Sequence, residues 1–129
     1  MKISDLDHIT VNVKDLKQSE EFYSDILGLE KTGFIDMGDH TLTYFQLPRE
    51  VRLELIDYTD KTSAGNIKET DTGTYRHFCL VTDQLAELHD TCVKKGIFVR
   101  KPPSYVEKLH ARTMLITDPN GVEIEVIQR

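Results

Sequence analysis

The sequence predicts an α+β protein made of two βαβββ modules in tandem, and three observations support this prediction. Residues 7–29 and 76–97 each contain a His in a strand-like run, an Asp before a helical pattern, and a Gly after it. Three strand candidates follow each helix. A segment rich in Thr, Asp, Gly and Ser separates the two halves. We therefore expect one domain over residues 1–129, with modules at 1–58 and 75–129 and a linker at 59–74.

Both helices are predicted from an apolar stripe between a cap and a terminating glycine. Asp15 precedes the first stripe, Gln18 stands at the third helical position of a capping box, and Gly28 ends the pattern. Asp83 and Gly96 mark the second helix in the same way. Because each helix has a single apolar face, we expect helices on only one side of each sheet.

The remaining strands are predicted from short apolar runs between turn residues. Gly38-Asp39, Pro102-Pro103 and the turn at residues 118–121 supply the boundaries. The expected strands are 29–37, 41–47 and 51–57 in the first module and 97–101, 112–117 and 122–127 in the second. Residues 102–111 are expected to form a loop over the functional site.

Composition narrows the class of partner. The chain has 129 residues, 39% of them hydrophobic, and a net charge of −6, which disfavours nucleic acid and anionic membranes. It has no apolar run that could span a bilayer and no secretion signal, so we expect a cytoplasmic protein with a small-molecule partner. Cys79 and Cys92 fit neither a disulfide framework nor a zinc motif, and both are expected to be reduced and buried.

Strand alternation predicts which side chains share the sheet face opposite the helices. His8, Thr10 and Asn12 share one such face in the first strand, and Arg52 and Glu54 lie on it in the fourth. The second module repeats the arrangement with the following residues: His77, Cys79, Glu123 and Glu125. Along the chain, His and Glu are separated by nearly the same number of residues in both modules.

Two imidazoles and two carboxylates form a suitable ligand set for one divalent metal, such as Ni, Zn, Co, Mn or Fe. Four protein ligands leave about two positions of an octahedral shell for substrate oxygens. Taken singly, a strand His or Glu is more often hydrogen-bonded or solvent-exposed, so only the repetition favours metal binding. Asn12 and Arg52 share the predicted site face and either contact the substrate or are ordinary surface residues.

Four segments also resemble a known family: DHITVNVKDLKQSEEFYSDILGL, RLELIDY, YRHFCLVTDQLAEL and DPNGVEIEVIQ. In their order and spacing they resemble the vicinal oxygen chelate superfamily, specifically its glyoxalase I-like branch. The resemblance implies a glyoxalase-like open barrel around a metal cleft, and a homodimer. It matches His8, Glu54, His77 and Glu125 to the family's metal ligands. Pairing of the modules within one chain and pairing between two chains both stay open.

The resemblance implies a metal-dependent lyase or isomerase of the lactoylglutathione lyase type, in which the metal stabilises an enediolate formed from a substrate with adjacent oxygens. Glu125 would be the catalytic base and Glu54 its counterpart. Related bacterial enzymes bind glutathione through an Arg and an Asn, where this chain has Asn12 and Tyr58, so the substrate and its thiol stay open. The alternatives are a dioxygenase or epimerase of the same superfamily, or a drug-binding resistance protein.

Overall fold

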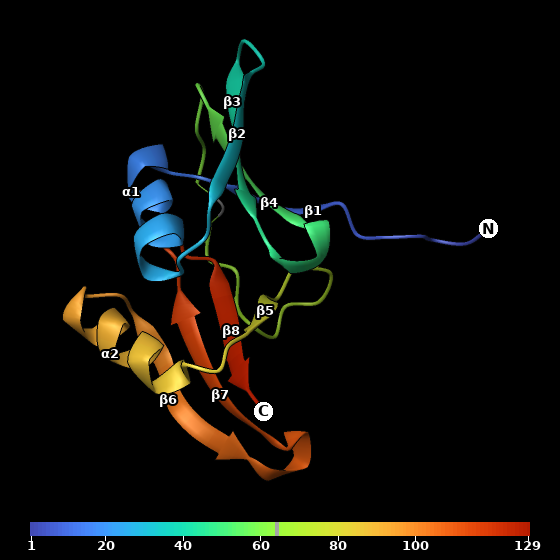
Figure 1. Cartoon of the computed structure of the whole chain (residues 1–129). Coiled ribbons are helices and arrows are strands. Elements are labelled where there is room, and N and C mark those ends of the chain that lie inside the picture. Colours follow the sequence, from blue (N-terminus) through green and yellow to red (C-terminus); the bar gives the residue numbers. More distant parts are fainter. Residues whose placement is uncertain (64) are drawn as a thin grey trace. The chain divides into compact units, whose positions relative to one another are not determined.

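A computed structural model describes residues 1–63 and 65–129, and the chain divides into two compact units, 1–61 and 62–129 (Figure 1). Each unit contains one four-stranded sheet with a helix after its first strand. The element order is βαβββ in both units once the short helical turns are set aside, so the predicted fold class is confirmed. None of the helices in the described residues is long and apolar enough to cross a membrane.

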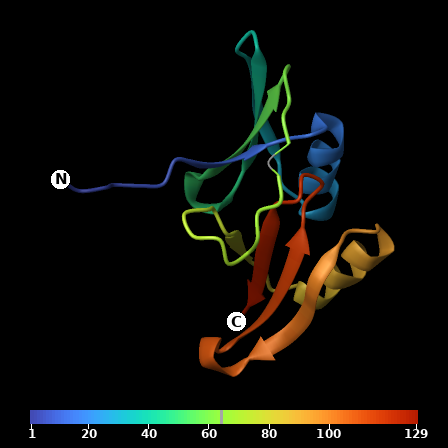
Figure 2. The same cartoon turned by 180° about the vertical axis from the view of Figure 1, so that it is seen from behind.

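Unit 1 has the strand order β1-β4-β3-β2, with β1 parallel to β4 and the other neighbours antiparallel. Its elements are β1 (His8–Asn12), α1 (Leu16–Glu21), the π-helical turn η1 (Phe22–Ile26), β2 (Lys31–Asp36), β3 (His40–Gln46), the 3-10 turn η2 (Pro48–Glu50) and β4 (Arg52–Tyr58). Residues 1–7 run outward from β1 as an extended segment in both views (Figure 1, Figure 2).

Unit 2 repeats this topology with the strand order β5-β8-β7-β6, and β5 is parallel to β8. Its elements are β5 (Phe78–Val81), α2 (Leu85–Lys94), β6 (Val99–Val106), the 3-10 turn η3 (Glu107–Leu109), β7 (Ala111–Thr117) and β8 (Glu123–Gln128). The helix α2 lies along β6, as both views show (Figure 2).

The core of each unit lies between its sheet and its helices, as predicted from the alternation. In unit 1, Leu53 and Leu55 of β4 and Phe45 of β3 are fully buried, and the ring of Tyr23 in η1 lies 6.2 Å from the ring of Phe45. In unit 2 the fully buried apolar residues come from α2, β7 and β8: Leu85, Cys92, Met114, Ile116, Ile124 and Val126. Each sheet therefore keeps its opposite face for other contacts.

The helix starts agree with the prediction in one unit and differ in the other. The Asp15 side chain accepts a hydrogen bond from the backbone N–H of Gln18, so the predicted cap of α1 is confirmed. The helix α2 begins one residue later than expected, with Gln84 at its N-cap and no side-chain cap bond. Asp83 is therefore not the cap. The backbone N–H of Gln84 donates its hydrogen bond to the Thr82 hydroxyl.

The prediction for residues 102–111 was wrong. The strand β6 continues through Pro102 and Pro103 to Val106, and its pairing with β7 shifts register between Lys101 and Ser104, where the prolines lie. Prolines lack the N–H that a sheet ladder needs, but they are tolerated at irregularities of an edge strand. The segment is thus a strand followed by the turn η3, not a free loop.

Candidate metal centre

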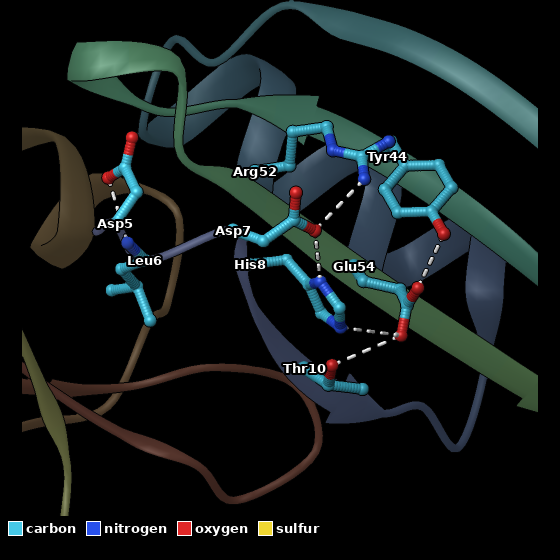
Figure 3. Close-up of polar contacts among 8 residues, drawn as sticks. All are labelled: Asp5, Leu6, Asp7, His8, Thr10, Tyr44, Arg52 and Glu54. Atoms are coloured by element: carbon cyan, nitrogen blue, oxygen red, sulfur yellow. Dashed lines mark hydrogen bonds and ion pairs between the residues drawn. The ribbon is translucent and has the colours of Figure 1, made fainter. Parts of the chain in front are cut away.

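In unit 1, His8 and Glu54 are brought together by the parallel pairing of β1 and β4. The register sets His8 beside Arg52 and Thr10 beside Glu54, on the sheet face away from the helix. The His8 Nε2 atom lies 3.8 Å from the Glu54 Oε1 atom (Figure 3). The predicted proximity of these two residues is present in the structure.

Asp7 orients the His8 ring. Its Oδ2 atom lies 2.6 Å from His8 Nδ1, and the hydrogen bond from His8 lowers the pKa of the Asp7 carboxyl, with a further lowering by Arg52. An ionised carboxylate only accepts hydrogen bonds, so in this contact Nδ1 carries the proton. A neutral imidazole in this tautomer presents the lone pair of Nε2 toward Glu54, which is the arrangement that metal-binding histidines use.

Two hydroxyl groups fix the Glu54 carboxylate. The Thr10 hydroxyl donates to Oε1 at 3.1 Å, and the Tyr44 hydroxyl donates to Oε2 at 2.5 Å (Figure 3). The Glu54 side chain is only 9% exposed. The hydrogen bond to Glu54, and then burial, raise the pKa of Tyr44, because an ionised phenol would face a carboxylate. Glu54 is thus held as a buried acceptor of two hydrogen bonds.

Sequence reasoning missed Tyr44 and Asp7. Tyr44 reaches Glu54 because β3 pairs with β4 in the register that sets these two residues opposite each other. An alternating apolar strand does not specify that register, so no signal in the sequence pointed to Tyr44. Asp7 could have been found, since an acidic residue directly before a candidate ligand His is a usual source of its second hydrogen bond.

The two predicted substrate residues lie on the expected face. Arg52 donates to Asp7 at 3.1 Å, and its guanidinium stacks 4.3 Å from the centre of the Tyr44 ring. These contacts make Arg52 part of the cluster around His8 and Glu54. Asn12 pairs with Ile56 in the ladder and is exposed.

In unit 2, His77 and Glu125 form the equivalent pair. The His77 Nε2 atom lies 3.9 Å from the Glu125 Oε2 atom, and His77 immediately precedes β5. The Nδ1 atom of His77 is buried without a hydrogen-bond partner among the described residues. The Glu125 side chain is 24% exposed, and its strand neighbour Cys79 donates its thiol hydrogen to the Leu80 backbone carbonyl at 3.8 Å.

Cys79 takes the position in unit 2 that Thr10 takes in unit 1, because it pairs with Glu125 as Thr10 pairs with Glu54. Partial burial raises the pKa of the Cys79 thiol to about 12, and the neighbouring Glu125 carboxylate adds to this. Cys79 is therefore a protonated thiol at neutral pH. The residue is exposed, so the expectation that both cysteines are buried is wrong for Cys79, while Cys92 is a free and buried cysteine as expected.

The residues in front of the two histidines have opposite charges. Asp7 precedes His8 and pairs with Arg52, whereas Arg76 precedes His77 and pairs with Glu123. Arg52 and Glu123 lie at equivalent places, two residues before Glu54 and Glu125. The same ion pair is thus present in both units with its charges exchanged, which explains why His8, unlike His77, has a carboxylate on its Nδ1 atom.

The four predicted ligands are present as two pairs, one in each unit. Among the described residues, no group of three or more His, Cys, Asp and Glu side chains is arranged to hold a metal ion. Each pair nevertheless fits one: zinc binds His nitrogen and carboxylate oxygen at about 2.0–2.2 Å. The donor atoms lie 3.8 and 3.9 Å apart, so a movement of either side chain by a few tenths of an ångström would bring both within bonding distance of one ion. The tautomer of His8 fits the same role.

Comparison with known proteins identifies the family to which the chain belongs. The chain belongs to the Glyoxalase/Bleomycin resistance protein/Dioxygenase superfamily, whose family model matches residues 5–126. The glyoxalase-like resemblance of the sequence is thereby confirmed. The family contains enzymes and resistance proteins, so membership alone does not define an activity.

The chain is similar to two curated relatives with different named activities and to one solved structure. A probable lactoylglutathione lyase of Synechocystis sp. is 29% identical over 94% of this chain and 92% of its own length. A mitochondrial methylmalonyl-CoA epimerase of Dictyostelium discoideum is 22% identical over 98% of this chain and 80% of its own length. A glyoxylase/bleomycin resistance protein/dioxygenase domain from Frankia sp. shares the fold with a TM-score of 0.81, at 18% identity and 98% coverage of both chains.

Proposed function

We propose that the protein is a divalent-metal-dependent lyase or isomerase of the glyoxalase I type. In this proposal His8, Glu54, His77 and Glu125 hold one metal, either Ni, Zn, Co, Mn or Fe. The observation that carries it is the repeated pair: each unit presents one imidazole nitrogen and one carboxylate oxygen, separated by 3.8 Å in unit 1 and 3.9 Å in unit 2. A bound metal would supply a Lewis acid for two adjacent oxygens of a small-molecule substrate.

The two carboxylates are held differently, and this supports different roles for them. Glu54 accepts hydrogen bonds from two hydroxyl groups and is nearly buried, so it suits a fixed ligand. Glu125 is more exposed: its side chain is 24% exposed, against 9% for Glu54. A base must move toward the proton that it takes, so we assign proton transfer next to a carbonyl to Glu125 in addition to ligation, and ligation alone to Glu54.

The decisive experiment measures metal content and activity in the same preparations. Metal-free protein is reloaded separately with each of the five ions and assayed with methylglyoxal plus glutathione or other thiols. The variants are His8→Ala, His77→Ala and, as a matched control, His40→Ala, because His40 also has an adjacent Asp at 2.6 Å on its Nδ1 atom. We expect one metal per active site in the wild type and the control, and loss of metal in the other two variants.

Two outcomes would contradict the proposal. If the wild-type protein binds none of the ions, the proposal of a metal site is wrong. If both His8→Ala and His77→Ala keep their full metal content, the assignment of His8 and His77 as ligands is wrong. Turnover that disappears in Glu125→Gln while the metal remains bound would support Glu125 as the base.

An epimerase is the second candidate, and the similarity to methylmalonyl-CoA epimerases favours it. Both reactions begin when a base removes a proton next to a carbonyl, so the same residues serve either one. Incubation of the metal-loaded protein with methylmalonyl-CoA in deuterated water separates the two. Deuterium entering the substrate would favour the epimerase, and turnover of the methylglyoxal–thiol adduct alone would favour the lyase.

We also propose that the protein acts as a homodimer. The proposal rests on family membership. Light scattering during size-exclusion chromatography measures the mass directly, and a mass of one chain at micromolar concentration would refute it.

A further inference from the structure

Four charged side chains form a closed ring in unit 2, beside the His77–Glu125 pair. Arg76 contacts Glu123 and lies 3.1 Å from Glu69, while Arg100 lies 2.6 Å from Glu123 and 3.0 Å from Glu69. Each carboxylate thus bridges the two guanidinium groups. The proposed chemistry uses none of these four residues.

The two carboxylates of the ring are not equivalent. Glu123 belongs to β8, its side chain is 13% exposed, and its two oxygens are divided between the two arginines. Glu69 lies in a turn outside the helices and strands and is 54% exposed. A single oxygen, Oε2, receives both guanidinium groups. Glu123 is therefore a fixed part of the sheet, and Glu69 is an exposed carboxylate that binds between two arginines.

The balance of charges in the ring favours an anion at the place where the Glu69 carboxylate lies. Arg76 and Arg100 carry two positive charges, and Glu123 neutralises one of them. The ring without Glu69 therefore has one net positive charge and a pair of guanidinium groups aimed at one point. Guanidinium groups bind carboxylate and phosphate oxygens through short, charge-assisted hydrogen bonds.

The ring is close to the proposed metal ligands. Glu123 and Glu125 are two residues apart on β8 and therefore project from the same face, about 6.6 Å apart along the strand. Arg76 directly precedes His77. A substrate of a few carbon atoms spans this distance.

We propose that Arg76 and Arg100 bind an anionic group of the substrate, a carboxylate or a phosphate, in the position that the Glu69 carboxylate occupies in the free protein. The inference rests on the proposed function, because it assumes that Glu125 acts on the same molecule. It assigns the substrate to small oxygen-rich compounds with an anionic group a few bonds from the reacting oxygens. Glu69 acts as an internal competitor that leaves when this group arrives.

The test is anion binding to the metal-free protein by titration calorimetry, with acetate and inorganic phosphate as separate probes at constant low ionic strength. We compare wild type, Glu69→Gln and Arg100→Gln. The control is Glu20→Gln, which removes one negative charge from an exposed pair with Lys31 in unit 1. Glu69→Gln should bind the anion about tenfold more tightly than the wild type, because the competing carboxylate is gone. A tenfold change corresponds to about one charge-assisted hydrogen bond. Arg100→Gln should abolish binding, and Glu20→Gln should match wild type.

The probe that binds more tightly identifies the anionic group as carboxylate or phosphate. The proposal is overturned if Glu69→Gln binds neither probe more tightly than Glu20→Gln does. In that case the ion pairs of Glu69 only stabilise the attachment of the turn around Glu69 to the sheet. Glu69→Gln would then show a lower unfolding midpoint and no gain in anion binding. Metal content, measured on the same samples, tests the proposed function separately, because the calorimetry is done without metal.

Discussion

Asp7 determines what His8 can offer to a metal ion. Its carboxylate accepts the hydrogen bond from Nδ1 and so fixes the tautomer and the ring orientation. His77 has no such partner among the described residues. The two histidines therefore differ in how firmly each is held before any ligand binds.

Replacing Asp7 by Ala should weaken metal binding about ten- to a hundredfold, the usual effect of losing the group that orients a ligand histidine. Affinity is measured by competition with a chromophoric chelator. Asp39→Ala is the matched control, since Asp39 holds His40 at the same distance of 2.6 Å. Arg52→Ala keeps the Asp7 carboxylate on His8, so it should weaken metal binding less than Asp7→Ala does. Equal affinities in Asp7→Ala and the wild type would show that His8 does not bind the metal.

The thiol of Cys79 should react slowly despite the exposure of the residue. Its pKa of about 12, against 9.0 for an unperturbed thiol, leaves about a thousandfold less thiolate at pH 8. Alkylation of the metal-free protein by iodoacetamide, followed by mass spectrometry, should therefore keep accelerating as the pH rises past 10. An ordinary cysteine reaches its full rate near pH 9–10. Glu125→Gln should speed the reaction at pH 8, and a plateau near pH 9 would contradict the assignment.

At the scale of elements, each helix ends at a glycine with a left-handed backbone. Gly28 follows η1 with φ of 70°, and Gly96 follows α2 with φ of 71°. No neighbouring atom lies within 4 Å of a Cβ added at either position. The requirement for glycine is therefore conformational and not steric.

Gly28→Ala should lower the free energy of unfolding by about 1 kcal/mol, because alanine is strained at a positive φ. Urea denaturation measures the change. Gly33→Ala is the control within the same unit, since Gly33 has no positive φ and its added Cβ would lie 3.7 Å from the Tyr44 ring, an ordinary contact. Equal stability of the two variants would contradict this account of the helix end.

The elements that could be predicted are those whose signal is local. Asp15 and Gly28 delimit the first helix, and alternation assigned Leu53 and Glu54 to opposite faces of β4. The extension of β6 past Pro103 was not predictable, because a bulged edge strand tolerates the residues that normally end one. The partners Tyr44 and Glu69 depend on strand register and on chain folding, which no local pattern encodes.

At the scale of the whole molecule, the proposed site requires a His–Glu pair from each unit. A metal that binds only the folded state raises the free energy of unfolding by about 2.7 kcal/mol at a concentration a hundred times its Kd. The wild type should show this gain, and both His8→Ala and His77→Ala should lose it. Thermal unfolding at fixed metal concentration measures the effect. If each pair bound its own ion, each variant would keep part of the gain, and that result would contradict a shared site.

The prolines of β6 have a consequence for how the protein behaves at high concentration. β6 is an edge of its sheet, and an edge strand offers unpaired backbone groups on which a strand of another molecule can add. Pro102 and Pro103 interrupt this row, because they have no N–H to donate and they lie where the pairing is irregular. Pro102 and Pro103, which made the segment look like a loop in the sequence, thus protect the chain from edge-to-edge aggregation.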